Sequence, residues 1–342
     1  MIEITSNINH TFTKTEKFIP SSVRRTELNE KFKSKIIHNP SLTRQLVSFQ
    51  ANKQIPFYGW FKYRGFSELL VTYILQNLRP QPGILLDPFA GGGSALFAAS
   101  ALKWQTIGIE LLPAGIYAIQ ARLVANKINP EEFRAVAVEL MQINFTEYYD
   151  QEYAFQHLAI TRGAFPSTNE KQLVGYIYYC HKFVLNNDIR TLLLYAAFCI
   201  LEDISYTRKD GQYLRWDARS ERSQGKKKFH KGIILTFSEA IQNKLNQIAS
   251  DLSSALNQQN LFSNNFLQQN TVKDTTSAKE IKPILHQDSC LKILPTIATN
   301  SIDFVLTSPP YVNRYDYTRT YALELVFLGC HSILDFGFWI LD

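Results

Sequence analysis

Apolar runs alternate with helical patterns in the first half of the chain. Apolar residues recur at helical spacing over residues 68–78, and proline and glycine after this segment would end the helix. The apolar residues 84–86 then predict a buried strand. A helix of small residues over 94–102 and a second strand over 106–109 follow. This order of elements predicts one half of a doubly wound α/β sheet.

The middle of the chain has a different pattern. Residues 131–256 are mostly amphipathic helix, and nine of the next fourteen residues are Asn or Gln, which predicts a polar linker. Strand patterns return over residues 283–287 and 303–306. We therefore expect an α/β core that is interrupted by a mainly helical insertion. The expected segments are an N-terminal extension (1–50), the first half of the core (51–130), the helical insertion (131–256), the linker (257–281) and the second half of the core (282–342).

The composition excludes several classes of protein. With 45% hydrophobic residues among 342, the chain has the apolar surface that an intrinsically disordered chain lacks. Its longest apolar run has ten residues, well short of the ~20 that cross a bilayer, and Met1 begins no secretory signal. The four cysteines include no Cys-x-x-Cys pair. We expect a soluble, cytoplasmic protein with no membrane partner.

The net charge of +6 is concentrated in one segment. Residues 208–231 contain nine Lys or Arg and three Asp or Glu, an excess equal to that of the whole chain. A basic patch on an otherwise neutral protein favours a polyanionic partner such as nucleic acid, although a solvated loop would have the same composition. The charge therefore needs support from other residues.

A glycine-rich turn follows the first predicted strand. Residues 87–94 read Asp-Pro-Phe-Ala-Gly-Gly-Gly-Ser, and three consecutive glycines allow a tight turn and the close approach of a ligand. Glu110 ends the next strand, where a carboxylate in a dinucleotide-type fold binds ribose hydroxyls. The spacing differs from Gly-x-Gly-x-x-Gly, which argues against a nicotinamide cofactor. A structural loop is the alternative for the turn taken by itself.

A second group of polar residues follows the last predicted strand. Residues 307–311 read Thr-Ser-Pro-Pro-Tyr. They stand at the carboxyl end of the strand, where open α/β sheets place their sites. The two prolines fix the backbone and remove two N–H donors, and a hydroxyl and an aromatic ring flank them. By itself this segment predicts a turn, but together with the glycine turn it indicates a site.

The two motifs together resemble the amino-group DNA methyltransferases of restriction–modification systems. Ser-Pro-Pro-Tyr is most typical of the members that methylate cytosine N4, whereas adenine-N6 enzymes more often carry Asp or Asn before the prolines. The resemblance covers residues 57–128 and 282–328. It implies a Rossmann-like sheet that binds S-adenosyl-L-methionine, the methyl donor, and duplex DNA as the substrate.

The resemblance also implies roles for individual residues. The expected cofactor-binding residues lie before the first helix of the core, in the glycine turn and at two strand ends: Tyr63, Arg64, Phe66, Ser67, Asp87, Pro88, Phe89, Ala90, Gly91, Gly93, Glu110, Asp288 and Ser289. The expected catalytic loop consists of Ser308, Pro309, Pro310 and Tyr311.

The expected chemistry follows from the substrate. The N4 lone pair of cytosine is delocalised into the ring, so this nitrogen is a poor nucleophile. Hydrogen bonds from its two protons to Ser308 Oγ and to the Pro309 carbonyl would stabilise the developing positive charge. The base must leave the duplex, and Tyr311 would stack on it. None of the four cysteines follows a proline, so the nucleophile of the cytosine-C5 enzymes is absent.

The basic segment then becomes the expected target-recognition region. Lys and Arg neutralise phosphates, and Arg can also read base edges. The expected DNA-binding residues are Arg208, Lys209, Arg215, Arg219, Lys226, Lys227 and Lys228. A helical structural insert with a solvated loop is the alternative.

The sequence leaves other functions open. An adenine-N6 methyltransferase would share both motifs, an RNA methyltransferase would have a related loop, and a non-catalytic DNA-binding remnant would keep the basic segment. The four predicted strands, around Leu85, Ile107, Leu285 and Val305, are fewer than the family core has. We therefore expect a truncated sheet that a second polypeptide completes or that an early end of the reading frame leaves incomplete. A cognate restriction endonuclease is the other expected partner.

Overall fold

The computed structural model describes the chain in separate stretches. These are residues 21–33, 42–48, 55, 57–61, 65–210, 213–222, 228–267, 282–310 and 316–330. The chain divides into two compact units, residues 1–43 and 44–342. Helix α1 (Ser21–Phe32) belongs to the first unit, and the short helix α2 (Arg44–Val47) belongs to the second. The expected N-terminal extension therefore contains one element of each unit.

A parallel sheet forms the α/β part of the second unit. In the part of the chain that the structure describes, it has four strands in the order β5-β2-β1-β6. The strands are β1 (Ile84–Asp87), β2 (Gln105–Ile109), β5 (Ile284–His286) and β6 (Phe304–Val305). All neighbouring pairs are parallel. These strands coincide with the four apolar runs of the sequence, so the prediction of the α/β class is confirmed.

Two helices pack against one another and against the central strand. α3 (Glu68–Leu78) and α4 (Ser94–Ala101) contribute to a core around Leu85 of β1. The alanines of α4 keep its backbone close to the strands, since they add little bulk. Ser67 begins α3, because its Oγ accepts a hydrogen bond from Leu69 N at 3.2 Å. The helix that the sequence predicted over residues 68–78 is thus confirmed.

The two edges of the sheet leave apolar side chains exposed. Val305 of β6 and Ile284 of β5 each expose 56% of their surface. Helix α10 (Cys290–Ile293) follows β5, and its Leu291 is 80% exposed. Within the described residues, both edge strands therefore offer apolar surface and unpaired backbone groups.

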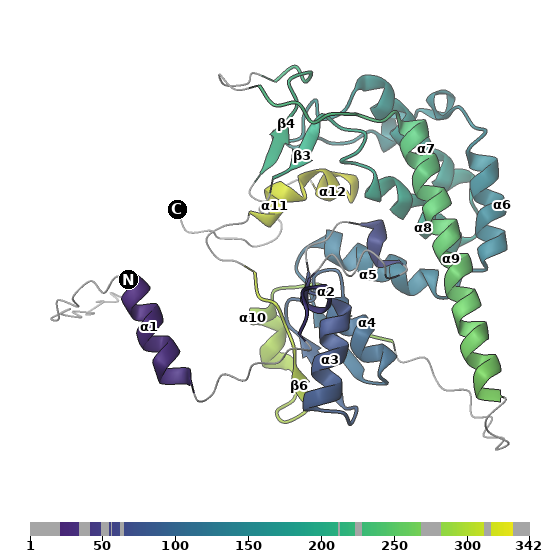
Figure 1. Ribbon diagram of the computed structural model, residues 1–342. Helices are drawn as coiled ribbons and strands as arrows, with labels where there is room; N and C mark the ends of the chain where they lie inside the picture. The colour runs from purple at the N-terminus through teal and green to yellow at the C-terminus, as the bar shows by residue number, and fades with distance from the viewer. Residues whose placement is uncertain are drawn as a thin grey trace, which may run out of the picture. The chain divides into compact units, whose positions relative to one another are not determined.

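Between the neighbouring strands β2 and β5, the chain forms a large helical part. Its helices are α5 (Pro113–Ala125), α6 (Pro130–Leu140), α7 (Ser167–Phe183), α8 (Asn187–Cys199) and α9 (Phe237–Leu267). Helices α7, α8 and α9 contact one another (Figure 1) and enclose a core in which Tyr176 and Phe198 are fully buried. Trp60 and Tyr321 belong to the same core, although both lie outside this helical stretch of the sequence. The helical part is therefore packed together with segments from both halves of the α/β core.

Helix α9 corrects one prediction. The sequence predicted that the last helix of the insertion ends at residue 256 and that a linker covers residues 257–281, but α9 continues to Leu267. Asn and Gln lower the ability of a segment to form a core, yet Gln and Leu remain good helix formers. The composition was therefore wrong as a sign of where the helix ends. Residues 268–281 lie outside the described residues.

The remaining elements are short. The antiparallel strands β3 (Thr207–Lys209) and β4 (Leu214–Trp216) form a separate ribbon, and α11 (Tyr317–Thr320) and α12 (Ala322–Phe327) follow the last strand of the sheet. Single 3-10 turns are η3 (Tyr58–Trp60), η4 (Phe145–Tyr148), η5 (Gln151–Tyr153) and η6 (Leu294–Thr296). Among the helices of the described residues, none has the length and apolar character needed to cross a membrane.

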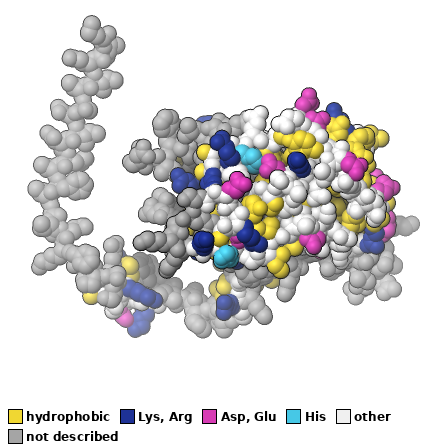
Figure 2. Space-filling model, turned by 90° about the horizontal axis from the view of Figure 1, so that it is seen from above, with side chains coloured by type: hydrophobic (Ala, Val, Ile, Leu, Met, Phe, Trp, Pro, Cys, Tyr) yellow, Lys and Arg dark blue, Asp and Glu magenta, His cyan; other side chains and the backbone are white. Residues whose placement is uncertain are grey.

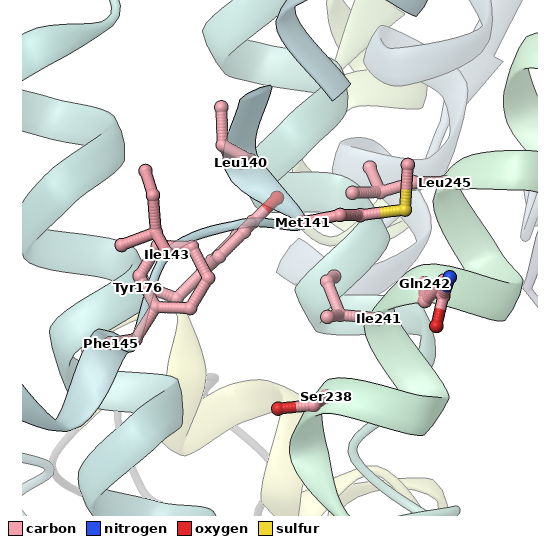
Figure 3. A pocket seen from close by; sticks show the side chains of 9 residues that line it. All are labelled: Leu140, Met141, Ile143, Phe145, Tyr176, Ser238, Ile241, Gln242 and Leu245. Carbon is pink, nitrogen blue, oxygen red and sulfur yellow. The ribbon is translucent and has the colours of Figure 1, made fainter. Parts of the chain in front are cut away.

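A small pocket opens in the helical part, between α6, the segment after it and α9 (Figure 3). Apolar side chains form most of its wall, together with the hydroxyl of Ser238 and the amide of Gln242. The lining residues are Leu140, Met141, Ile143, Phe145, Tyr176, Ser238, Ile241, Gln242 and Leu245. They include no charged side chain and none of the residues that the sequence indicated for function. The pocket is therefore separate from the candidate site.

Candidate functional site

Four polar residues lie at the carboxyl ends of the four strands. Asp87 is the last residue of β1, Glu110 follows β2, Asp288 stands two residues after β5, and Thr307 stands two residues after β6. Because the strands are parallel, their carboxyl ends lie on the same side of the sheet. The structure therefore brings together residues that the sequence separates by up to 220 positions.

The glycine turn after β1 depends on glycine at two positions. Gly91 and Gly93 have φ angles of 54° and 84°, in the left-handed region that other residues rarely adopt. Gly93 N donates to Ala90 O at 2.8 Å, and Ala90 N donates to Ile109 O at 2.9 Å. The second bond ties the turn to the neighbouring strand. The turn therefore holds its shape beside Glu110.

Glu110 is buried beneath this turn. Its Oε2 accepts a hydrogen bond from Gly91 N at 2.7 Å, and its Oε1 accepts one from Leu112 N at 2.8 Å. Burial raises the pKa of Glu110 to about 7, and these two backbone bonds oppose the increase. Each carboxylate oxygen has a second lone pair. Glu110 can therefore accept further hydrogen bonds at the surface of the turn.

Asp87 connects the glycine turn to the second motif. Its Oδ1 accepts hydrogen bonds from Thr307 Oγ1 at 2.7 Å and from Phe89 N at 3.1 Å. Burial raises the pKa of Asp87 to about 6, and the Thr307 bond is the largest effect that lowers it. Thr307, which directly precedes Ser308, is thus hydrogen-bonded to the carboxylate at the start of the glycine turn.

Gly115, which the sequence analysis did not single out, lets helix α5 pack closely against the glycine turn and Glu110. A Cβ atom at Gly115 would lie 2.7 Å from Gly91 O and 2.8 Å from Glu110 Cγ. Helix α5 therefore approaches the turn as closely as it does because position 115 has no side chain. A glycine inside a strongly helical segment was the available signal in the sequence.

The catalytic loop predicted from the sequence is only partly described. Leu306 N donates to Leu86 O at 3.1 Å, which extends the pairing of β6 with β1 up to the loop. Ser308, Pro309 and Pro310 are exposed at the carboxyl end of the sheet. Tyr311 lies outside the described residues. The described part of the loop is thus accessible to a substrate.

The second predicted acid, Asp288, makes only local contacts. Its Oδ1 accepts from Ser289 N at 2.6 Å and lies 3.2 Å from Lys292 Nζ, and these contacts lower the pKa of Asp288. The hydroxyl of Ser289 caps α10 by accepting from Leu291 N. Asp288 is ionised and half-exposed, next to the strand that borders Glu110.

The other predicted cofactor residues lie around the turn. Ser67 and Ala90 are buried, Phe66 and Pro88 are half-buried, and Phe89 is 37% exposed. Tyr63 and Arg64 lie outside the described residues.

An ion pair that the sequence analysis missed links α3 to α5 next to this region. Glu68 forms a two-pronged ion pair with Arg122, whose Nη2 lies 3.1 Å from Glu68 Oε2. The Arg122 guanidinium also lies 3.9 Å from the centre of the Phe97 ring. Since α3 and α5 flank the turn, this pair helps to keep both helices in place.

The basic segment is divided into two sets of cations. In the first set, the cationic groups bind carboxylates or backbone carbonyls of the protein. Lys209 Nζ lies 2.5 Å from the carboxylate of Glu324, which is 1% exposed, and Arg219 pairs with Asp217 through atoms 2.7 and 2.9 Å apart. Lys231 Nζ donates to Ser205 O at 2.8 Å and also to the carbonyl of Glu202. These cations hold the segment together.

The second set of cations faces solvent. Arg208, Arg215 and Lys228 are exposed, and Figure 2 shows several Lys and Arg side chains close together on the face that it draws. Lys226 and Lys227 lie outside the described residues. Lys209, for which the sequence predicted a DNA contact, does not belong to this second set, because its ammonium group pairs with the buried carboxylate of Glu324. Arg219 is half-exposed, but Asp217 and the Gly232 carbonyl occupy its guanidinium in the same way.

Most of this chain is similar to curated proteins of two kinds. Type II methyltransferase M.AvaI, from Nostoc sp. and from Anabaena variabilis, is 41% identical over 305 residues, which are 88% of this chain and 60% of the relative. Type II methyltransferase M.BsoBI of Geobacillus stearothermophilus is 36% identical over 328 residues, which are 92% of this chain and 60% of the relative. No family model matches the chain, and no solved structure matches it significantly.

The matches cover most of this chain but a smaller share of each relative. The relatives are matched along almost all of this chain, including the glycine turn, the basic segment and most of the helical part, since at most 12% of it lies outside each match. The chain itself spans about 60% of the length of these curated relatives. Along most of its length, this chain is therefore similar to proteins named Type II methyltransferases.

Proposed function

We propose that the chain acts as an S-adenosyl-L-methionine-dependent DNA methyltransferase of a restriction–modification system. The main support is the hydrogen bond between Thr307 and Asp87, which joins the Ser-Pro-Pro segment to the glycine turn at one edge of the sheet. A methyl transferase must hold its donor and its acceptor within reach of each other. The similarity to Type II methyltransferases supports the same class of reaction.

The residues at the glycine turn fit the proposed cofactor. Glycine at positions 91, 93 and 115 lets the turn adopt left-handed backbone angles and pack closely against α5, so the turn keeps its shape beside Glu110. Glu110 offers a carboxylate with free lone pairs to ribose hydroxyls, and Asp288 offers an ionised carboxylate to the adenine amino group. The cofactor would supply a methyl group that is already activated by its sulfonium. The protein then has to orient the two reactants and exclude water.

The proposed substrate is the exocyclic N4 of cytosine in duplex DNA. Ser308 Oγ and the Pro309 carbonyl would accept hydrogen bonds from the two protons of that nitrogen, so that its lone pair becomes available. Burial raises the pKa of Cys180 and of Cys199 to about 12, so neither is a ready thiolate nucleophile. Ser-Pro-Pro-Tyr favours cytosine N4, and adenine N6 is the alternative target.

The proposed partners are duplex DNA, a cognate restriction endonuclease and a polypeptide that extends the sheet. The exposed cations Arg208, Arg215 and Lys228 support an interaction with DNA phosphates or bases. The exposed apolar residues Val305 and Ile284 support the addition of further strands at the edges of the sheet.

Methyl transfer from labelled cofactor tests the proposal directly. The purified full chain would be incubated with methyl-labelled S-adenosyl-L-methionine and duplex DNA, and the DNA would be digested to nucleosides. We expect label in N4-methylcytosine. Label in N6-methyladenine would move the target to adenine, label in RNA but not in DNA would change the substrate class, and binding of duplex DNA without any transfer would indicate a non-catalytic remnant.

Ser308→Ala tests the catalytic assignment. We expect the rate of methyl transfer to fall about 100-fold, because one preorganised hydrogen-bonding group contributes about that factor in comparable sites. The affinity for duplex DNA should change little, since Ser308 is not part of the basic segment. Ser254→Ala, an exposed position of α9, is the matched control. An unchanged transfer rate in Ser308→Ala would show that this hydroxyl has no catalytic role.

A further inference from the structure

The β3–β4 ribbon places two arginines directly opposite each other. Arg208 pairs with Arg215 in the antiparallel register, between the pairs Thr207–Trp216 and Lys209–Leu214. Directly opposite residues lie on the same face of a ribbon, and their neighbours lie on the other face. Arg208 and Arg215 are both exposed. One face of the ribbon thus carries both arginine side chains.

The other face of the ribbon is anchored to the helical part. Thr207 is fully buried, and Leu214 is 7% exposed and belongs to the large helical core. Lys209 reaches Glu324 of α12, and its ammonium also lies 4.8 Å from the ring centres of Phe61 and Tyr321. In Figure 1 the ribbon lies beside α11 and α12, the helices that follow the catalytic loop in sequence. The two arginines are therefore carried on a fixed support.

The outward pair is electrostatically unfavourable without a ligand. Like charges directly opposite each other destabilise a ribbon. Arg215 forms an exposed ion pair with Asp210 at 3.7 Å, and its guanidinium rests 4.1 Å from the centre of the Phe229 ring. None of the hydrogen bonds or ion pairs found among the described residues involves the side chain of Arg208. A ligand with several acceptors would relieve the repulsion between the two arginines and would bind the Arg208 guanidinium.

We propose that the β3–β4 ribbon enters the major groove of duplex DNA, where Arg208 and Arg215 read guanine bases. This inference rests on the proposed function, because it assumes that the chain binds duplex DNA. The major groove is about 12 Å wide and admits a two-stranded ribbon, whose strands lie about 5 Å apart. Guanine presents two acceptors, O6 and N7, which match the two-pronged arginine side chain.

The division of the basic segment assigns the remaining cations to other tasks. Lys209, Arg219 and Lys231 hold the ribbon and the following loop in place through Glu324, Asp217 and backbone carbonyls. Lys228 is exposed outside the ribbon and suits a phosphate, which accepts a simple point charge. We therefore assign base reading to Arg208 and Arg215, the two outward-facing arginines of the anchored ribbon.

Conservative variants separate base reading from charge. Arg208→Lys and Arg215→Lys keep the positive charge but lose the planar fork. We would select bound sequences from a pool of randomised duplexes with the full chain and with each variant, and Arg134→Lys on α6 would serve as the control. We expect the native chain to enrich a motif that contains guanine. Each ribbon variant should bind the unselected pool with nearly native affinity and lose about tenfold in preference at one guanine, as expected for one two-pronged contact.

A modified base identifies which guanine each arginine reads. Replacing a preferred guanine by 7-deazaguanine removes the N7 acceptor. The native chain should lose about tenfold in affinity, and the variant of the arginine that reads this base should lose nothing further. The inference is overturned if both lysine variants enrich the native motif unchanged, or if the native chain shows no sequence preference. A clear guanine preference without methyl transfer would instead contradict the proposed function and leave this inference standing.

Discussion

The two candidate binding regions of this chain handle charge in opposite ways. At the carboxyl end of the sheet, the carboxylates Asp87 and Glu110 are buried and accept hydrogen bonds from Thr307 and from backbone N–H groups. Burial raises the pKa of both. On the β3–β4 ribbon, the charges are cations, of which some are neutralised inward and the others, such as Arg208, face water.

This difference indicates what each region can bind. A buried carboxylate with a raised pKa is stabilised by ligand groups that donate hydrogen bonds or carry positive charge. An exposed cation keeps its hydration and is best suited to a polyanion that arrives with counterions to release. Ligand binding at the first region therefore depends on shape and desolvation. Ligand binding at the second region depends on long-range charge and on the orientation of the cations.

The largest effect on stability is expected at the buried ion pair between Lys209 of the ribbon and Glu324 of α12. Lys209→Met would leave Glu324 buried without its cation, and we expect the free energy of unfolding to fall by about 3–5 kcal/mol. Within the described residues, Glu324 Oε2 already has no hydrogen-bond partner, so this oxygen offers no contact that would replace the lost cation. Chemical denaturation measures the change.

The double variant is the control for this prediction. Lys209→Met with Glu324→Leu replaces the pair by two apolar side chains against Phe61 and Tyr321, and it should recover stability to within about 1 kcal/mol of the native chain. If Lys209→Met alone costs less than about 1 kcal/mol, the inward cation is not an anchor, and the contrast between the two sets of cations fails.

The second prediction concerns pH and applies to the sheet end. Between about pH 4.5 and about pH 7, the folded chain binds protons at Glu110 that the unfolded chain does not bind, and Asp87 acts likewise up to about pH 6. The free energy of unfolding should therefore increase as the pH falls through this window, by on the order of a few kcal/mol, and the gain is lost as the pH rises through about 7. Denaturation at several pH values measures this slope.

Binding of the cofactor should have the opposite pH dependence. Ribose hydroxyls and a positive charge favour the ionised carboxylates, so the affinity for S-adenosyl-L-methionine should fall as the pH drops from about 7 to about 5, and binding near pH 6.5 should release protons. Calorimetry in buffers of different ionisation enthalpy measures the release. Glu110→Gln should flatten both profiles. If stability and affinity fall together on acidification, the buried carboxylates do not control this region.

The sequence predicted the sheet end well because its signals are local. The four strands were visible as apolar runs, and the acids at their ends belong to the same short segments as the runs. Parallel pairing then placed Asp87 and Glu110 at one edge without further information. The contacts that complete the site were not predictable, because Gly115 and the pair Glu68–Arg122 act through helices that meet only in the folded chain.

The basic segment was predicted less well because its signal was a count of charges. Arg208 and Lys209 are adjacent in the sequence, but they lie on opposite faces of β3, one exposed and one paired with Glu324. Which of them turns inward depends on the partner strand and on a carboxylate that is 115 residues away. The sequence therefore indicated the presence of a cationic surface, and the structure was needed to identify its members.

The smallest effect provides the sharpest test of that division, because it compares cations of one segment under one condition. A cation that neutralises a phosphate contributes about 0.9 to the slope of log affinity against log salt concentration. Lys228→Ala, which removes the exposed cation assigned to a phosphate, should therefore reduce the slope for duplex DNA by about one unit. Arg219→Ala should leave the slope unchanged, because Asp217 and the Gly232 carbonyl already occupy this guanidinium. Binding measured over a series of salt concentrations distinguishes the two, with Arg134→Ala as the control outside the segment. Equal slopes for the Lys228 and Arg219 variants would mean that DNA recruits the protein-bound cations as well, and the segment would then act as one diffuse positive surface.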